Sequence, residues 1–110
     1  MRWESKFEKW PGFIELPDVD DFMPVHWRDW REALKAVTET EGEDQRRALY
    51  QSFAVAGAAW IVKHGTWAID GISAESMTTL EGADGVPVKF QAWLNKQLER
   101  YFADLLNPKG

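Results

Sequence analysis

The two histidines, His26 and His64, are the first residues of this 110-residue chain to consider for chemistry. His26 falls near the start of one expected helix and His64 near the end of another, and neither has a second ligand at the spacing of a metal site. A histidine near a helix C-terminus interacts favourably with the helix dipole or with the last carbonyl groups. We therefore expect no metal site, and a structural role for His64.

Three aspartates, Asp18, Asp20 and Asp21, superficially resemble the start of a calcium-binding loop. Such a loop needs glycine at its sixth position and glutamate at its twelfth, where this chain has Met23 and Asp29. The match to a calcium loop fails. Capping of the following helix by Asp20 or Asp21 explains these acidic residues better.

His64, Asp70 and Ser73 contain the residue types of a hydrolytic triad. No nucleophile-elbow motif surrounds Ser73, however, and the chain has no glycine-rich loop of the kind that holds phosphate. The sequence thus predicts a protein that is not an enzyme and that binds no cofactor.

The composition narrows the classes of partner. The chain has 18 acidic and 13 basic side chains, a net charge of −5, and no basic stripe, so we expect no nucleic-acid partner. It has no cysteine, which excludes disulfides and thiolate metal sites. The N-terminal region lacks an apolar run long enough for a signal peptide or a membrane span. We expect one soluble domain, made in the cytoplasm, without a membrane partner.

The segment KFEKWPGFIELPD, residues 6–18, is the unusual part of the chain because it places large apolar side chains around a Pro-Gly turn. Apolar and polar residues alternate on both sides of Pro11 and Gly12, from Phe7 to Lys9 and from Phe13 to Leu16, which predicts a short β-hairpin or an extended arm. This arm covers residues 1–22, and a helical body covers residues 23–110. The arm either packs on its own domain or contacts another chain. The candidate protein-binding residues are Trp3, Phe7, Trp10, Phe13 and Ile14.

Three principal helices are predicted by apolar periodicity, and the fold class is mainly α. They run from Pro24 to Val37, from Glu43 to His64 and from Pro87 to Leu106. Thr40 and Glu43 have capping-box spacing, Gly65 stops the second helix, and Asn107-Pro108 stops the third. The connector between the last two helices, residues 65–85, has weak strand alternation over Thr66–Ile69 and a short expected helix over Ala74–Leu80 that Ser73 could cap.

The apolar faces of these helices predict the core. Gly57 and the neighbouring alanines of the second helix should allow another helix to approach closely. The chain has seven tryptophans; we expect Trp60 and Trp93 to be buried, and Trp3 and Trp10 to be the most exposed. Because such faces can build a dimer as well as a core, self-association is left open. The predicted faces are 27/30/34/37, 49/53/56/60 and 90/94/98/101/105.

The order of these features is similar to that of the small tail assembly chaperones of long-tailed bacteriophages and their relatives on prophages, over nearly the whole chain. Members of that family combine a Pro-Gly/Leu-Pro arm, a Trp-containing helix, a W-x-(aliphatic)-x-Gly connector and a final aromatic helix that ends in Pro-Lys. The matching residues here are Pro11-Gly12 with Leu16-Pro17, Trp30 with Ala33-Leu34, Trp67 to Gly71, Trp93 to Phe102, and Pro108-Lys109.

The resemblance implies a non-enzymatic phage tail assembly chaperone in the host cytoplasm. Such a protein binds the long helical tape measure protein, keeps it soluble and helps to recruit tail tube subunits during virion morphogenesis. Two alternatives stay open. The first is a structural virion component, such as a head-tail adaptor, whose arm docks on a neighbouring subunit. The second is a helical domain that binds a small molecule, or an enzyme, with pockets between its helices.

Overall fold

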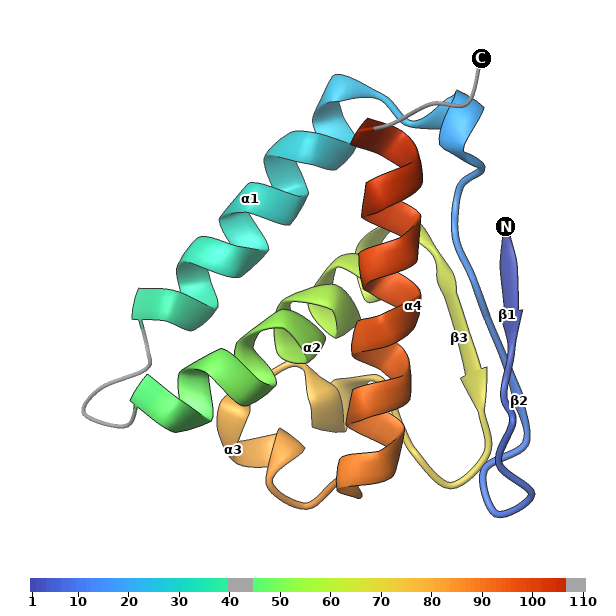
Figure 1. Cartoon of the computed structure of the whole chain (residues 1–110), viewed down its shortest axis with the longest axis vertical. Coiled ribbons are helices and arrows are strands. Elements are labelled where there is room, and N and C mark those ends of the chain that lie inside the picture. Colours follow the sequence, from blue (N-terminus) through green and yellow to red (C-terminus); the bar gives the residue numbers. More distant parts are fainter. Residues whose placement is uncertain (40–44, 107–110) are drawn as a thin grey trace.

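A computed structural model describes residues 1–39 and 45–106, except for the side chains of residues 38, 45–50 and 52. The chain is mainly helical, as predicted, and a small sheet lies along one side of its helices (Figure 1). Its elements, in chain order, are β1 (Arg2–Glu4), β2 (Gly12–Glu15), η1 (Val19–Asp21), α1 (Pro24–Glu39), α2 (Gln45–His64), β3 (Thr66–Ile69), η2 (Glu75–Met77), α3 (Leu80–Ala83) and α4 (Val88–Leu106).

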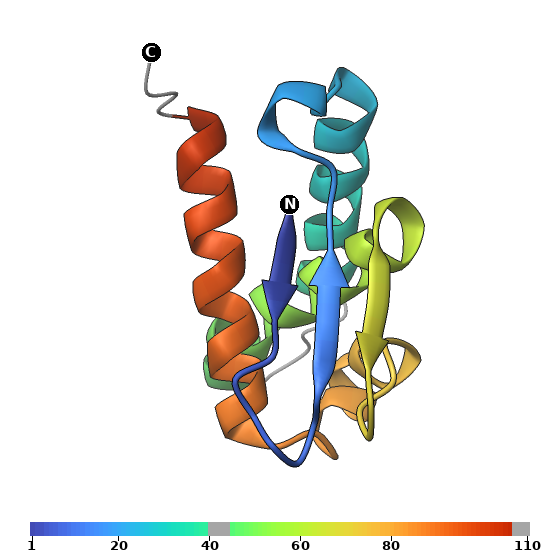
Figure 2. The same cartoon turned by 90° about the vertical axis from the view of Figure 1, so that its right-hand side faces the viewer.

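The N-terminal arm is part of a three-stranded antiparallel sheet, not a separate hairpin. Strand β2 lies in the middle, where Ile14 pairs with Trp3 on β1 and with Trp67 on β3 (Figure 2). The first strand also lies earlier in the chain than predicted, because the segment around Phe7 to Lys9 forms the connection instead. This connection is closed by Ser5, whose backbone N–H donates to the Gly12 carbonyl at 2.9 Å and whose Oγ donates to the Trp10 carbonyl at 2.6 Å.

Gly12 is a position that only glycine can fill. Its φ of +133° lies in the region that favours glycine. A Cβ at this position would lie 1.8 Å from the carbonyl oxygen of Ala68 on β3. The Pro-Gly pair therefore does not form the expected hairpin turn, and its glycine instead lets β2 begin close against β3.

The long helices follow the predicted boundaries closely. Helix α1 begins at Pro24, α2 ends at His64 before Gly65, and α4 begins one residue after Pro87. Asp20 and Asp21 do not cap α1, because they lie in η1. The Met23 carbonyl accepts the first helical hydrogen bond, from His26 N–H at 2.9 Å, which makes Met23 the N-cap. The predicted capping box of Thr40 and Glu43 and the stop at Asn107-Pro108 lie outside the described residues.

The connector between α2 and α4 contains two short helices, η2 and α3, in place of the single helix expected over Ala74–Leu80. Ala74, not Ser73, is the N-cap of η2; Ser73 lies one residue earlier, and its Oγ accepts the Ser76 N–H at 3.2 Å. Thr79 caps α3 by accepting the Gly82 N–H at 3.0 Å. The buried amide of Gln91 on α4 then donates to the carbonyls of Ala83 and Val86, at 2.8 and 2.9 Å, and fixes the connector against α4.

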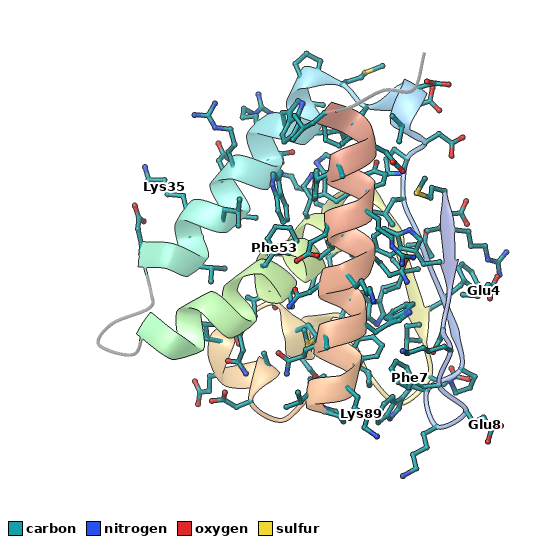
Figure 3. The ribbon with its side chains drawn as sticks, viewed as in Figure 1. Glu4, Phe7, Glu8, Lys35, Phe53 and Lys89 are labelled. Carbon is teal, nitrogen blue, oxygen red and sulfur yellow. The ribbon has the colours of Figure 1, made fainter. Side chains whose placement is uncertain are left out.

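The core forms where α2 and α4 cross beneath the sheet. Gly57 of α2 lies against Leu98 of α4, so the predicted close approach is confirmed. Phe53 lies in the space between α1, α2 and α4, whereas Lys35 points away from the body (Figure 3). Trp60 and Trp93 are buried, as predicted. In the part of the chain that the structure describes, no helix is both long enough and apolar enough to cross a membrane.

Candidate protein-binding surface

Two of the five predicted binding residues, Trp3 and Ile14, belong to the core. Ile14 is 0% exposed and Trp3 is 8% exposed. They face each other across β1 and β2, and the Trp3 ring meets the Tyr101 ring of α4 edge-on with 6.1 Å between centroids. The expectation that Trp3 is among the most exposed tryptophans is therefore wrong, because β1 carries it under α4.

Phe7 and Trp10 are half-buried on the first turns of α4. The centroids of their rings lie 5.2 Å apart. The ring centroid of Phe7 lies 6.2 Å from that of Trp93, and the ring centroid of Trp10 lies 6.2 Å from that of Phe90. Figure 3 shows Phe7 beside the start of α4, near Lys89. The domain's own last helix thus covers one side of this aromatic pair.

Phe13 lies on the opposite face of the sheet from Ile14, since neighbouring strand residues alternate. The guanidinium of Arg2 lies over its ring, 3.6 Å from the centroid, in a cation–π contact. Of the five arm residues, Phe7, Trp10 and Phe13 are half-buried, whereas Trp3 and Ile14 are buried. Contact of these three with a partner stays a prediction.

An open apolar groove runs along α1, a place that the sequence analysis did not assign to binding. It encloses about 810 Å³. Its apolar residues begin just before the helix, and Met23 at its end is 59% exposed. The lining residues are Phe22, Met23, Pro24, Trp27, Arg28, Arg31, Glu32, Leu34 and Lys35; we call this set the α1 groove.

The α1 groove exists because the apolar face of α1 is wider than the surface that α2 and α4 cover. Trp30 and Val37 are buried, whereas Trp27 and Leu34 at the edge of the same face stay half-exposed. The Trp27 ring packs against the rings of Phe22 and of Phe102 on α4, with 5.3 and 5.8 Å between ring centroids. Met23, Trp27 and Leu34 follow one another by four and seven residues. This spacing is the sequence signal that could have distinguished the exposed edge of the apolar face from the part that is buried in the core.

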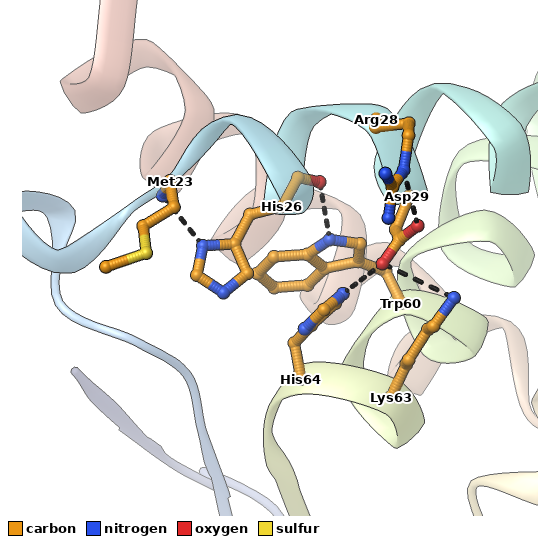
Figure 4. A network of polar contacts seen from close by, with 7 residues as sticks. All are labelled: Met23, His26, Arg28, Asp29, Trp60, Lys63 and His64. Atoms are coloured by element: carbon orange, nitrogen blue, oxygen red, sulfur yellow. Dashed lines mark hydrogen bonds and ion pairs between the residues drawn. The ribbon is translucent and has the colours of Figure 1, made fainter.

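A polar network joins the end of α2 to α1 (Figure 4). The carboxylate of Asp29, whose side chain is only 4% exposed, accepts a hydrogen bond from Nε2 of His64 at 2.7 Å. Lys63 Nζ lies 3.3 Å from the same carboxylate, and Arg28 Nε lies 3.6 Å from it. The hydrogen bond from His64 is the main cause of a lowered pKa at Asp29, and it outweighs the burial that would raise it. Asp29 is therefore ionised, and its hydrogen bond with His64 ties α1 to α2; we call this contact the clamp of Asp29 with His64.

His26 belongs to the same region and closes the first turn of α1. Its Nδ1 accepts the backbone N–H of Met23 at 2.8 Å, the reciprocal half of a capping box. Its carbonyl accepts the indole N–H of Trp60 at 2.9 Å. Burial lowers the pKa of His26, and the nearby His64 lowers it further, while Asp29 opposes them. The uncharged ring is the form that can accept the Met23 hydrogen bond.

The structure does not bring together the residues of the hydrolytic triad that was considered from the sequence. His64 pairs with Asp29 on α1, not with Asp70, and Ser73 Oγ lies 2.8 Å from Ser76 Oγ. The residue types of the considered triad are therefore not brought into one chain of hydrogen bonds. Within residues 1–39 and 45–106, no group of three or more histidine, cysteine or acidic side chains is arranged to hold a metal ion.

The geometry thus leaves the α1 groove, with its exposed apolar wall and its row of charges, as the candidate functional site. Comparisons with models of protein families, with curated proteins and with solved structures found no match to this chain.

Proposed function

We propose that this protein is a non-enzymatic phage tail assembly chaperone. In this role it binds the tape measure protein in the host cytoplasm, keeps that long helical protein soluble and helps to recruit tail tube subunits around it. The proposal combines the resemblance of the arm, helices and connector with a surface suited to holding another protein.

The observation that carries the proposal is the α1 groove. A chaperone for a long amphipathic helix needs an apolar surface that its own fold leaves uncovered. Met23, Trp27 and Leu34 form such a surface along one helix, while Trp30 on the same helix anchors it in the core. We place the main contact with the tape measure protein here, and the exposed parts of Phe7, Trp10 and Phe13 provide a second contact or a tail tube contact.

The helix that carries the groove, α1, is fixed to α2 by polar contacts, which favours a preformed binding site. The clamp of Asp29 with His64 and the hydrogen bond from Trp60 to the His26 carbonyl both tie α1 to α2. A site that is ordered before binding loses less conformational entropy when a partner docks.

Co-expression with a tape measure protein, taken from the neighbouring gene if one is encoded there, tests the proposal. The wild-type chain should keep that protein in the soluble fraction and elute with it from a size-exclusion column. A double variant, Met23→Gln with Leu34→Gln, should lose the complex while retaining its helical circular dichroism. The matched control is Val62→Gln with Val88→Gln, which changes two exposed valines, 53% and 58% exposed, that do not line the groove. An insoluble tape measure protein in the presence of the wild-type chain would overturn the proposal.

Mass spectrometry of purified particles separates this role from that of a structural virion component. A chaperone should be absent from mature virions, whereas a head-tail adaptor should be present at a fixed copy number. A wild-type chain that elutes as a dimer, and whose groove variant elutes as a monomer, would instead assign the groove to self-association.

A further inference from the structure

Among the residues that line the α1 groove, basic side chains outnumber acidic ones, in a chain that is negative as a whole. The lining contains three basic side chains, Arg28, Arg31 and Lys35, and one acidic side chain, Glu32; Asp29 and Glu39, outside the lining, pair with Arg28 and Lys35. The complete chain has a net charge of −5. The three basic residues follow one another by three and four positions, which places them in one row along α1.

Arg31 is the basic side chain that remains available to a partner, whereas Arg28 and Lys35 have partners within the fold. Arg28 and Lys35 are 66% and 75% exposed, and their ion pairs with Asp29 and Glu39, at 3.6 and 3.8 Å, face solvent on the basic side. The pair of Lys35 with Glu39 is exposed on both sides and contributes little, whereas Arg28 compensates the buried charge of Asp29. Arg31 makes no ion pair within the part of the chain that the structure describes. A carboxylate brought by a partner can therefore pair with Arg31 without breaking an ion pair of the fold.

We infer that the α1 groove takes an acidic amphipathic helix from the partner protein; this rests on the function proposed above and adds the chemistry of the bound segment. The stretch of α1 from Pro24 to Lys35 is roughly 17 Å long, which corresponds to about three helical turns. The bound helix places apolar side chains at positions i, i+3 or i+4, and i+7 against Met23, Trp27 and Leu34. Its aspartates and glutamates lie beside the basic row.

A helix fits this surface better than a lipid or a nucleic acid does. The side chains of Met23, Trp27 and Leu34 follow one another in a row on one wall of the α1 groove. A second helix can pack its own side chains against such a row. The groove carries only three basic residues and includes Glu32, and the acidic remainder of the chain repels an anionic membrane or a phosphate backbone. Charge complementarity therefore selects an acidic protein segment.

Two designed peptides of 18 residues provide the probes. Both carry leucine at helical spacing on one face; one has glutamate on the flanks of that face and the other has lysine. Fluorescence anisotropy of the labelled peptides against the full chain should show saturable binding of the glutamate peptide, at least about tenfold tighter than the lysine peptide and weakened by added salt. The Arg31→Glu variant should weaken the glutamate peptide about tenfold. The control Arg100→Glu reverses an exposed charge on α4 and should leave binding unchanged.

The outcomes distinguish this inference from the proposed function. Equal binding of both peptides, lost in the groove double variant, overturns the acidic preference and leaves an apolar chaperone groove. Failure of both peptides, while the tape measure protein still elutes with the chain, overturns the helix-in-groove inference alone. Failure of both peptides together with an insoluble tape measure protein overturns both proposals. Binding to vesicles of phosphatidylserine and phosphatidylcholine without peptide binding assigns the groove to membranes and also overturns the inference.

Discussion

The side chain of Leu98 on α4 packs against the bare backbone of Gly57 on α2. A Cβ at Gly57 would lie 2.2 Å from Cδ1 of Leu98, and Leu98 is fully buried. This contact sets how closely the two helices approach at their crossing. It therefore sets the frame on which both α1 and the sheet rest.

Gly57→Ala should lower the free energy of unfolding by about 1 kcal/mol. Alanine gains up to about 1 kcal/mol over glycine in a helix, but overpacking a buried contact costs about 1–3 kcal/mol. Urea denaturation followed by circular dichroism measures the difference. The matched control is Gly85→Ala, where a new Cβ has its nearest neighbour at 3.6 Å and should cause no loss. A stabilised Gly57→Ala protein would contradict the close packing.

Trp10→Ala should reduce the free energy of unfolding by about 2 kcal/mol, less than the roughly 3–5 kcal/mol of a fully buried aromatic residue. The reason is that Trp10 is half-buried against Phe7 and Phe90. Phe13→Ala should cost about 1 kcal/mol, chiefly through the lost contact with Arg2. Both unfolding and binding to the proposed tape measure partner are measured. If either change leaves unfolding unaltered and weakens binding by about 2 kcal/mol or more, that residue is a partner contact.

The stability of the protein should fall as the pH drops below about 6.5, in part because of His26. Its pKa is lowered in the folded state by burial and by His64, so the unfolded chain takes up a proton first. His26→Gln should reduce this slope, because glutamine can still accept the Met23 N–H but does not titrate there. Urea midpoints are compared between pH 5 and 8. His64 is present in both proteins, so an identical slope would show that His26 does not contribute.

Tyr101→Phe should lower the free energy of unfolding by about 1–2 kcal/mol. The Tyr101 hydroxyl donates to the Pro17 carbonyl at 2.6 Å, and this ties α4 to the end of the arm. Thermal unfolding at neutral pH measures this loss.

Burial, assisted by Asp18, raises the pKa of Tyr101 to about 12. The contribution of Tyr101 to the free energy of unfolding is therefore complete below about pH 10, the pKa of an unfolded tyrosine. This contribution is lost as the pH rises to about 12. An ultraviolet titration of phenolate formation, compared with that of the Phe variant, isolates Tyr101 from Tyr50. A Tyr101 component that ionises near pH 10 would contradict the buried environment.

The helices could be predicted because their signals are local. Pro24 marks the start of α1, Gly65 the end of α2, and apolar residues recur with helical period between such marks. Their close approach at Gly57 could be predicted for the same reason. Mainly helical content therefore follows from short windows of sequence.

The sheet and the groove depend on contacts between distant residues, which local patterns do not reveal. Strand β3 alternates only weakly, and its pairing with β2 joins residues as far apart as Gly12 and Ile69. Trp27 and Trp30 belong to one apolar face in sequence. Only the crossing of α2 and α4 decides that Trp30 is covered and Trp27 stays half-exposed. The clamp of His64 with Asp29 likewise needs the arrangement of two helices.

The order in which the ribosome releases the chain gives the central position of β2 a kinetic cost. Ile14 can pair with Trp67 only after β3 has been synthesised. The rings of Phe7 and Trp10 can pack on Trp93 and Phe90 only after α4 has been synthesised. At ordinary rates of synthesis, this interval is on the order of ten seconds. Helices α1 and α2 can pair during this time, whereas the arm stays uncovered until α4 has emerged. The nascent protein is thus most open to aggregation, and to capture by cellular chaperones, through its first residues and immediately before its last helix folds.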